Sequence, residues 1–229
     1  MESKSIRNNI FNLKKDITNI CIGCKRNPKD IRIVAASKTK SIKEISLAYK
    51  SGISNFGENY LQEAIPKIEG LEKKDINWHF IGSIQKKKCK KIALLFDWVH
   101  TIDRVEIAEK LNEYRKILPN KLNILIQINI NEEKSKAGIN ISDLKNFSDK
   151  LLPFNNLEVK GLMALPKQTN DAILQTNNFS NLYKALDQLK LTFPEACELS
   201  MGMSNDYPAA ITQSSTIVRI GTTIFGKRV

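Results

Sequence analysis

Residues 31–51 read IRIVAASKTKSIKEISLAYKS. Ile31–Ala36 is a short, nearly continuous apolar run, which is typical of a parallel strand buried on both faces. Ser41–Ser51 follows it with a helical pattern. A strand that leads directly into a helix predicts one β–α unit of a parallel sheet.

The same unit recurs along the chain. The further strand candidates are Ile53–Phe56, Trp78–Ile81, Trp98–Ile102, Ile124–Ile130, Val159–Ala164, Glu198–Met201 and Thr216–Ile220. Helical stretches fill the gaps at Ser41–Ser51, Tyr60–Leu71, Lys86–Leu95, Arg104–Leu118, Ser142–Leu151, Asp171–Leu191 and Asp206–Gln213. We expect four residues to cap the helices that follow them: Ser41, Asp103, Ser142 and Asn170.

About eight such units predict an α/β fold in which the sheet closes into a single (β/α)₈ TIM barrel. The barrel forms one domain over residues 1–229, and a helix precedes the first strand, covering the bottom or the side of the barrel. An open doubly wound sheet is the alternative, because the number of strands is uncertain from one sequence.

Composition and cysteine usage indicate the compartment. The chain has 229 residues, 41 % of them hydrophobic, and no apolar run approaches the roughly 20 residues that cross a bilayer. Its start lacks the apolar core of a signal peptide, so we expect a cytoplasmic protein without membrane contact. Cys21 and Cys24 form a C-x-x-C without a second ligand pair, which favours free thiols over a metal or redox site.

The net charge of +12 raises the question of a nucleic-acid partner. However, the lysines are spread along a chain that is also rich in Ile and Asn, which indicates a general compositional bias. The densest run, Lys86–Lys91, is typical of a solvated helix face. No nucleic-acid motif or interleaved aromatic residues accompany it, so we expect no nucleic-acid partner.

Lys38 is the first candidate for chemistry, because it directly follows the first strand. Functional residues of such barrels lie at the carboxyl ends of the strands. Burial of the Lys38 stem against apolar side chains would favour the neutral amine, which attacks a carbonyl carbon. A surface lysine at a strand exit is the alternative, and Lys136 is the second choice as a covalent anchor.

The ends of the last two strands predict a phosphate site. Barrel phosphate sites are frequently built from the loops after strands seven and eight. Met203 and Ser204 precede a predicted helix and offer a hydroxyl and backbone N–H groups, and Gly221 and Thr222 follow the last strand. Ordinary helix capping by Ser204 is compatible with the same role.

Two polar residues lie within apolar strands. Arg219 needs a partner if it is buried, either a carboxylate or an acceptor on a ligand. His79 is either a satisfied core histidine or a ligand contact.

Several segments, in order and at plausible spacing, resemble the pyridoxal 5′-phosphate (PLP) homeostasis protein family. They are AASKTK, FGENYLQEA, WHFIGSIQ, QININ followed by KAG, VKGLMAL, SMGMSNDY and VRIGTTIFG. The resemblance implies a PLP fold-type-III barrel, similar to the N-terminal domain of alanine racemase. It also implies PLP bound as an imine (a Schiff base) on Lys38, phosphate contacts from Ser204, Gly221 and Thr222, a pyridine-nitrogen contact from Arg219, and a pocket role for Asn59.

One loop departs from the family pattern. The family commonly reads close to HFIGPLQSNK, whereas this chain reads HFIGSIQKKK. Ser83 therefore stands in place of a usual proline, and the conformation of that loop is open.

The leading functional hypothesis is a PLP carrier in vitamin B6 homeostasis, without robust catalysis. PLP-dependent apo-enzymes are its expected recipients, and a monomer or weak dimer its expected state. A PLP-dependent amino-acid racemase is the alternative. The sequence ends at Val229, soon after the last strand, so we expect it to lack the C-terminal β-domain from which such racemases take a catalytic tyrosine. A third hypothesis, a nucleic-acid-binding module, is supported by the net charge alone.

Overall fold

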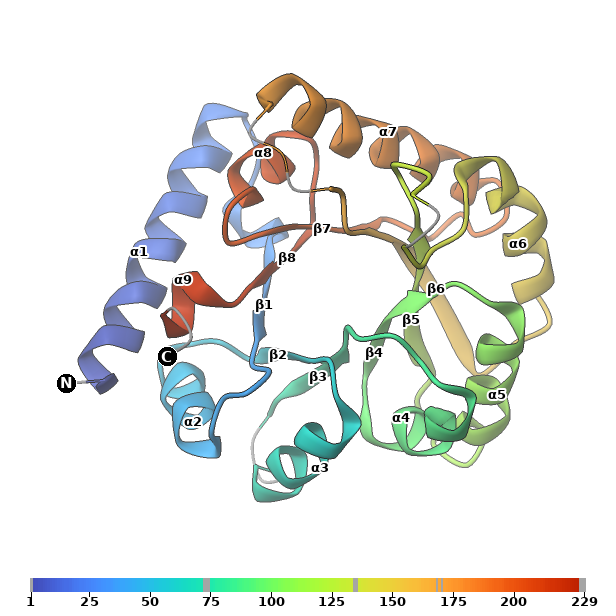
Figure 1. Cartoon of the computed structure of the whole chain (residues 1–229), viewed down its shortest axis with the longest axis horizontal. Coiled ribbons are helices and arrows are strands. Elements are labelled where there is room, and N and C mark those ends of the chain that lie inside the picture. The colour runs from blue at the N-terminus through green and yellow to red at the C-terminus, as the bar shows by residue number, and fades with distance from the viewer. Residues whose placement is uncertain (1, 72–74, 134–135, 168, 170, 227–229) are drawn as a thin grey trace.

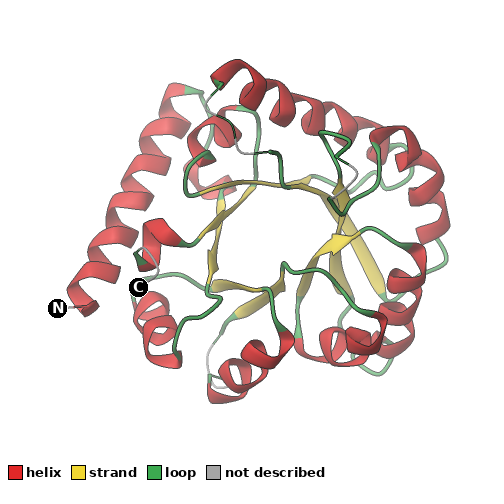
Figure 2. Ribbon diagram, viewed as in Figure 1, coloured by secondary structure: helices red, strands yellow, loops and turns green. Residues whose placement is uncertain are grey.

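The computed structural model describes residues 2–71, 75–133, 136–167, 169 and 171–226. Eight parallel strands close into a barrel in sequence order, which confirms the predicted fold and excludes the open sheet. Figures 1 and 2 show the ring of strands surrounded by helices. The strands are β1 (Arg32–Ala36), β2 (Asn55–Glu58), β3 (Asn77–Phe80), β4 (Trp98–Ile102), β5 (Leu122–Ile128), β6 (Leu157–Ala164), β7 (Glu198–Met203) and β8 (Ile217–Ile220).

Helices alternate with the strands around the outside. They are α1 (Glu2–Gly23), α2 (Ile42–Lys50), α3 (Leu61–Gly70), α4 (Cys89–Leu95), α5 (Val105–Arg115), α6 (Leu144–Leu151), α7 (Ala172–Lys190), α8 (Tyr207–Thr212) and α9 (Thr222–Phe225). Short 3₁₀ helices lie at Pro28–Asp30, Lys86–Lys88 and Ile141–Asp143. In the part of the chain that the structure describes, no helix is long and apolar enough to cross a membrane.

The amino-terminal helix α1 covers the side of the barrel, where it packs against α2, α8 and α9 (Figure 1). The amide of Asn9 donates to the carbonyl of Ile224 at 3.0 Å, and Arg26 donates to the carbonyl of Ile211 at 2.7 Å. Helix α1 and the segment that follows it therefore fasten the last β–α units to the first.

Predicted helix starts agree only in part with the structure. Ser41 forms a capping box with Glu44 at the start of α2, as predicted. The predictions for Asp103 and Ser142 are wrong, because Arg104 precedes α5 without a side-chain cap and Ser142 lies inside a 3₁₀ helix. Asn170 lies outside the described residues.

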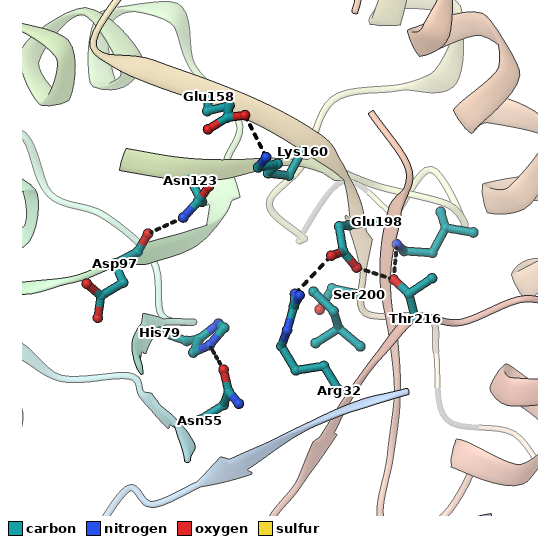
Figure 3. A network of polar contacts seen from close by, with 12 residues as sticks. Arg32, Asn55, His79, Asp97, Asn123, Glu158, Lys160, Glu198, Ser200 and Thr216 are labelled. Atoms are coloured by element: carbon teal, nitrogen blue, oxygen red, sulfur yellow. Dashed lines mark hydrogen bonds and ion pairs between the residues drawn. The ribbon is translucent and has the colours of Figure 1, made fainter. Parts of the chain in front are cut away.

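The centre of the barrel is packed. Val34, Trp98, Leu125, Met163 and Ile217 form one apolar cluster within the barrel, separate from the larger core between strands and helices. At the amino ends of the strands, Figure 3 shows Arg32 reaching Glu198. The structure thus leaves the carboxyl ends as the place for a site.

Candidate functional site at the carboxyl ends of the strands

Lys38 lies in a tight turn at the end of β1. The backbone N–H of Lys40 donates to the carbonyl of Ser37 at 2.9 Å, which closes the turn around Lys38 and Thr39. The Lys38 side chain is half-buried, and none of the described residues forms an ion pair or hydrogen bond with its ammonium. Lys136, in contrast, is paired with Glu133 at 2.8 Å. The geometry therefore favours Lys38 as the available amine.

Ser204 connects the ends of β7 and β8. Its Oγ accepts from the backbone N–H groups of Gly221 and Thr223, each at 3.3 Å, at the start of α9. Thr222 is exposed at the first position of this short helix. The predicted phosphate residues are thus brought together, and the sequence prediction missed only the helix α9 that supplies the N–H groups.

Gly221 is not required by close packing. A Cβ atom placed there would lie 3.6 Å from the carbonyl oxygen of Ala36, which is an ordinary contact. The packing of the protein therefore does not require glycine at this position. Its neighbour Ala36 ends β1, two positions before Lys38, so the N–H groups of α9 and the amine share one side of the barrel mouth.

Arg219 is a buried cation. It is 4 % exposed, and it donates through Nη1 to Ser200 Oγ and through Nη2 to the carbonyl of Ala164 at 2.9 Å. Burial lowers its pKa to about 10, and the charge of Asp206 partly offsets this, so Arg219 is charged at neutral pH. Within the described chain no carboxylate forms an ion pair with it. A guanidinium has five N–H donors, so three are left for another acceptor.

A chain of hydrogen bonds holds Arg219 from below. Ser200 Oγ lies 2.9 Å from His100 Nδ1, His100 Nε2 lies 2.8 Å from His79 Nδ1, and His79 Nε2 lies 3.0 Å from Asn55 Oδ1. Figure 3 shows the lower part of this chain, from His79 to Asn55.

The direction of every hydrogen bond in this chain follows from its ends. Arg219 only donates, so the Ser200 hydroxyl accepts from it and donates to His100 Nδ1. His100 then donates from Nε2 to His79, and His79 donates from Nε2 to the amide oxygen of Asn55. Burial holds the pKa values of both histidines well below the usual range, so both rings are neutral and each carries the one N–H that this direction requires.

This arrangement decides between the two interpretations of His79. The ring is fully buried, and both nitrogens have protein partners. His79 has no free donor or acceptor for a ligand, so the structure favours the satisfied core histidine over the predicted ligand contact. Sequence reasoning missed His100 and Ser200, whose only signal is a polar residue within an apolar strand.

Asn59 follows β2 and carries an unmet polar atom. Its Oδ1 is buried and has no hydrogen-bond partner among the described residues. An unpaired buried acceptor costs about 1–3 kcal/mol, so such a group is typical of a ligand contact. This observation supports the predicted pocket role of Asn59.

Met203 lines a cavity of about 420 Å³ on the side of β5–β7. Gln127, Asn129, Lys136 and Leu165 also line it. The predicted cofactor residue Met203 thus faces open space at the carboxyl ends of the strands.

Comparison with known proteins identifies the family. The model of the alanine racemase N-terminal domain matches residues 2–229. The pyridoxal phosphate homeostasis protein of Pasteurella multocida is 41 % identical over 228 residues, which cover 98 % of this chain and 98 % of that protein. The chain belongs to the pyridoxal phosphate homeostasis protein family. The family resemblance of segments such as AASKTK and SMGMSNDY is thereby confirmed.

Solved structures agree with membership of the pyridoxal phosphate homeostasis protein family. PipY of Synechococcus elongatus, solved with PLP bound, is 29 % identical with a TM-score of 0.84, over 96 % of this chain and all of that one (100 %). Alanine racemase from Corynebacterium glutamicum is 15 % identical with a TM-score of 0.76, and the match covers 98 % of this chain and 61 % of the racemase. The likeness to the racemase concerns the fold alone.

Proposed function

We propose that this chain holds PLP at the barrel mouth through a covalent bond to Lys38 and serves PLP homeostasis inside the cell, without robust catalysis. The observation that carries the proposal is Arg219, a buried cation with donors to spare and no carboxylate partner in the described chain. The unmet Oδ1 of Asn59 and the unpaired amine of Lys38 lie at the neighbouring strand ends. The residues therefore fit the cofactor.

PLP supplies an aldehyde that condenses reversibly with an amine and a phosphate that takes hydrogen bonds. Lys38 is the amine for this bond. Ser204 and Thr222 offer hydroxyl groups to the phosphate, and Gly221 offers a backbone N–H. Asn59 contributes a pocket contact.

Arg219 explains why holding is favoured over turnover. With a pKa of about 10, it donates a hydrogen bond to the pyridine nitrogen but keeps its proton at neutral pH. A ring nitrogen without a proton is a weak electron sink, which disfavours carbanion formation at an amino acid. The name of the Pasteurella multocida relative, a pyridoxal phosphate homeostasis protein, supports the same interpretation. Release to PLP-dependent apo-enzymes is the expected use of the held cofactor.

The first experiment tests the anchor. We expect PLP-loaded protein to show an imine absorbance that borohydride reduction traps on Lys38, as peptide mapping would reveal. Lys38→Ala should abolish the trapped adduct, whereas Lys136→Ala should keep it. A reducible adduct at full occupancy in Lys38→Ala would show that the anchor lies elsewhere.

The second experiment tests catalysis. PLP-loaded protein is incubated with L- and D-alanine and L-serine in deuterated water, and exchange of the Cα proton is followed by NMR. A positioned general acid–base group raises the rate of proton transfer by about 10²–10⁴-fold, so protein without such a group should exchange the Cα proton measurably more slowly. Exchange at several turnovers per second that depends on Lys38 would contradict the carrier proposal and favour the racemase.

A further inference from the structure

A buried ion pair lies directly behind the turn that carries Lys38. Lys67 of α3 is 6 % exposed, Glu58 at the end of β2 is fully buried, and their Nζ and Oε1 atoms lie 2.8 Å apart. Glu63, one turn earlier on α3, lies 3.8 Å from the same ammonium. A charged lysine and a charged carboxylate are almost never buried unless they are paired, and even a buried pair contributes little to stability. The burial of this pair therefore indicates a role other than stabilising the fold.

Each member of the cluster contacts the turn as well as its ionic partner. Lys67 Nζ donates to the carbonyl of Ser37 at 2.9 Å, and the Ser37 hydroxyl donates to Glu58 Oε1 at 2.6 Å. Glu63 Oε2 accepts the backbone N–H of Thr39 at 2.8 Å. The residues on both sides of Lys38 are thus held by charged side chains from β2 and α3.

The turn needs such support, because its backbone is strained. Thr39 has a φ of +66°, in the left-handed region that β-branched residues avoid. Strained residues of this kind persist only where the surroundings hold them, and they cluster at functional sites.

The ion pair leaves one oxygen of Glu58 without a partner. Glu58 Oε2 is buried and has no hydrogen-bond partner among the described residues. Burial raises the pKa of Glu58, although the hydrogen bonds from Lys67 and Ser37 act against this. A buried carboxylate with one unmet oxygen contributes little to the stability of the fold. Its other oxygen, Oε1, is well placed to accept the hydrogen bond from Ser37.

We propose that Glu58, Glu63 and Lys67 are positioning residues that hold the turn of residues 37–40 so that Lys38 meets the aldehyde of PLP. The inference rests on the proposed function of Lys38. The three side chains bond to the turn and to one another, so the proposal assigns them no contact with the cofactor. Nζ of Lys38 attacks the aldehyde carbon, and water leaves as the C=N bond forms; the cluster acts only on where that amine lies.

Two ligands separate positioning from binding. PLP binds and then bonds to Lys38, whereas pyridoxine 5′-phosphate has an alcohol in place of the aldehyde and binds without a covalent bond. Stopped-flow absorbance measures the rate of bond formation with PLP, and calorimetry measures the affinity for pyridoxine 5′-phosphate. Only the first quantity depends on the placement of Lys38.

Four variants complete the design. Lys67→Met removes the ammonium and keeps the length of the stem, Lys67→Arg keeps the charge, and Glu63→Ala removes the most exposed member of the cluster. Arg115→Met is the matched control, because Arg115 is another buried cation (5 % exposed) that donates to backbone carbonyls, those of Ala93 and Phe96, on α4 and before β4.

Displacement of a reacting group by about 1 Å reduces rates by as much as 100-fold. We therefore expect Lys67→Met to slow bond formation by about 10- to 100-fold and Glu63→Ala to slow it less, with affinity for pyridoxine 5′-phosphate within about threefold of wild type. Lys67→Arg should recover part of the rate. Arg115→Met should lower the melting temperature and leave the rate unchanged.

Each other outcome has a defined meaning. Wild-type rates in both Lys67→Met and Glu63→Ala would overturn the positioning role. If Lys67→Met does not fold, Glu63→Ala decides alone. Equally slow bond formation in Arg115→Met would show a general effect of lowered stability and would also overturn the positioning role. If wild-type protein binds pyridoxine 5′-phosphate but bonds PLP at another lysine, the anchor assignment fails; if it binds neither ligand, the proposed function fails.

Discussion

Acidification should destabilise this protein through the two buried histidines. His79 and His100 are the only histidines in the sequence, and both are fully buried and neutral in the folded state. Burial is the main cause that lowers the pKa of each, and the charge of Arg32 acts in the same direction. The unfolded chain titrates near the ordinary histidine value of 6.5. The unfolded state therefore binds more protons below that pH, and stability falls as pH falls through this range.

The size of the effect follows from the unfolded state alone. If the folded histidines stay neutral, each loses about 1.4 kcal/mol of stability between about pH 7.5 and pH 5.5. Both together predict a loss of about 3 kcal/mol, which is a large part of the stability of a typical domain. Glu58 and Asp97 act in the opposite direction, because burial raises their pKa values and the folded state holds their protons more tightly.

Urea denaturation of wild-type protein at both pH values measures the loss by linear extrapolation. His79→Gln and His100→Gln keep an amide in the chain of hydrogen bonds and remove one titrating ring each. We expect each variant to lose about half as much stability on acidification as wild type, whatever its stability at neutral pH. If either variant shows the same pH dependence as wild type, the histidine that it replaces is not a titrating group, and the neutral folded state assigned to that ring does not account for the acid sensitivity.

Two further predictions concern the hydroxyl groups on which Arg219 and the phosphate depend. Ser200→Ala leaves His100 Nδ1 without a donor and Arg219 Nη1 without an acceptor, and should cost about 1–3 kcal/mol in urea unfolding at neutral pH; an unchanged stability would show that water replaces the hydroxyl. Ser204→Ala should weaken PLP retention by about tenfold or more and leave the affinity for unphosphorylated pyridoxal similar, as equilibrium dialysis would measure; equal losses for both ligands would place the phosphate elsewhere.

The fold was predictable because its signal is local and repeated. Every predicted strand overlaps an observed one, since buried parallel strands consist of short apolar runs. The boundaries of β2 and β5 differ, because pairing with neighbouring strands sets the register. Strand β2 extends to Glu58, two residues beyond the predicted end at Phe56, and Glu58 remains buried there because Lys67 supplies a cation.

The candidate site was predictable where topology alone places a residue. Lys38, Ser204 and Arg219 follow or end strands, and barrel closure brings strand ends together. The chain from Arg219 to Asn55 was not predictable, because its members lie on β2, β3, β4, β7 and β8 and the pairing of His100 with Ser200 spans 100 positions. Such contacts exist only after the barrel closes.

The hydrogen bonds of the polar residues separate the structural residues from the functional ones. His79, His100 and Ser200 have every ring nitrogen or hydroxyl matched within the barrel, so they form a core that needs no ligand. Asn59 keeps an unmet oxygen, and Arg219 has N–H donors beyond the two that bind Ser200 and Ala164, so both can take a ligand atom. Arg219 is held by Ser200 and the carbonyl of Ala164 and keeps its proton at neutral pH, so the cofactor that we propose would meet a fixed hydrogen-bond donor there and not a proton source. In the proposed function, this arrangement favours holding the cofactor over turnover at an amino acid.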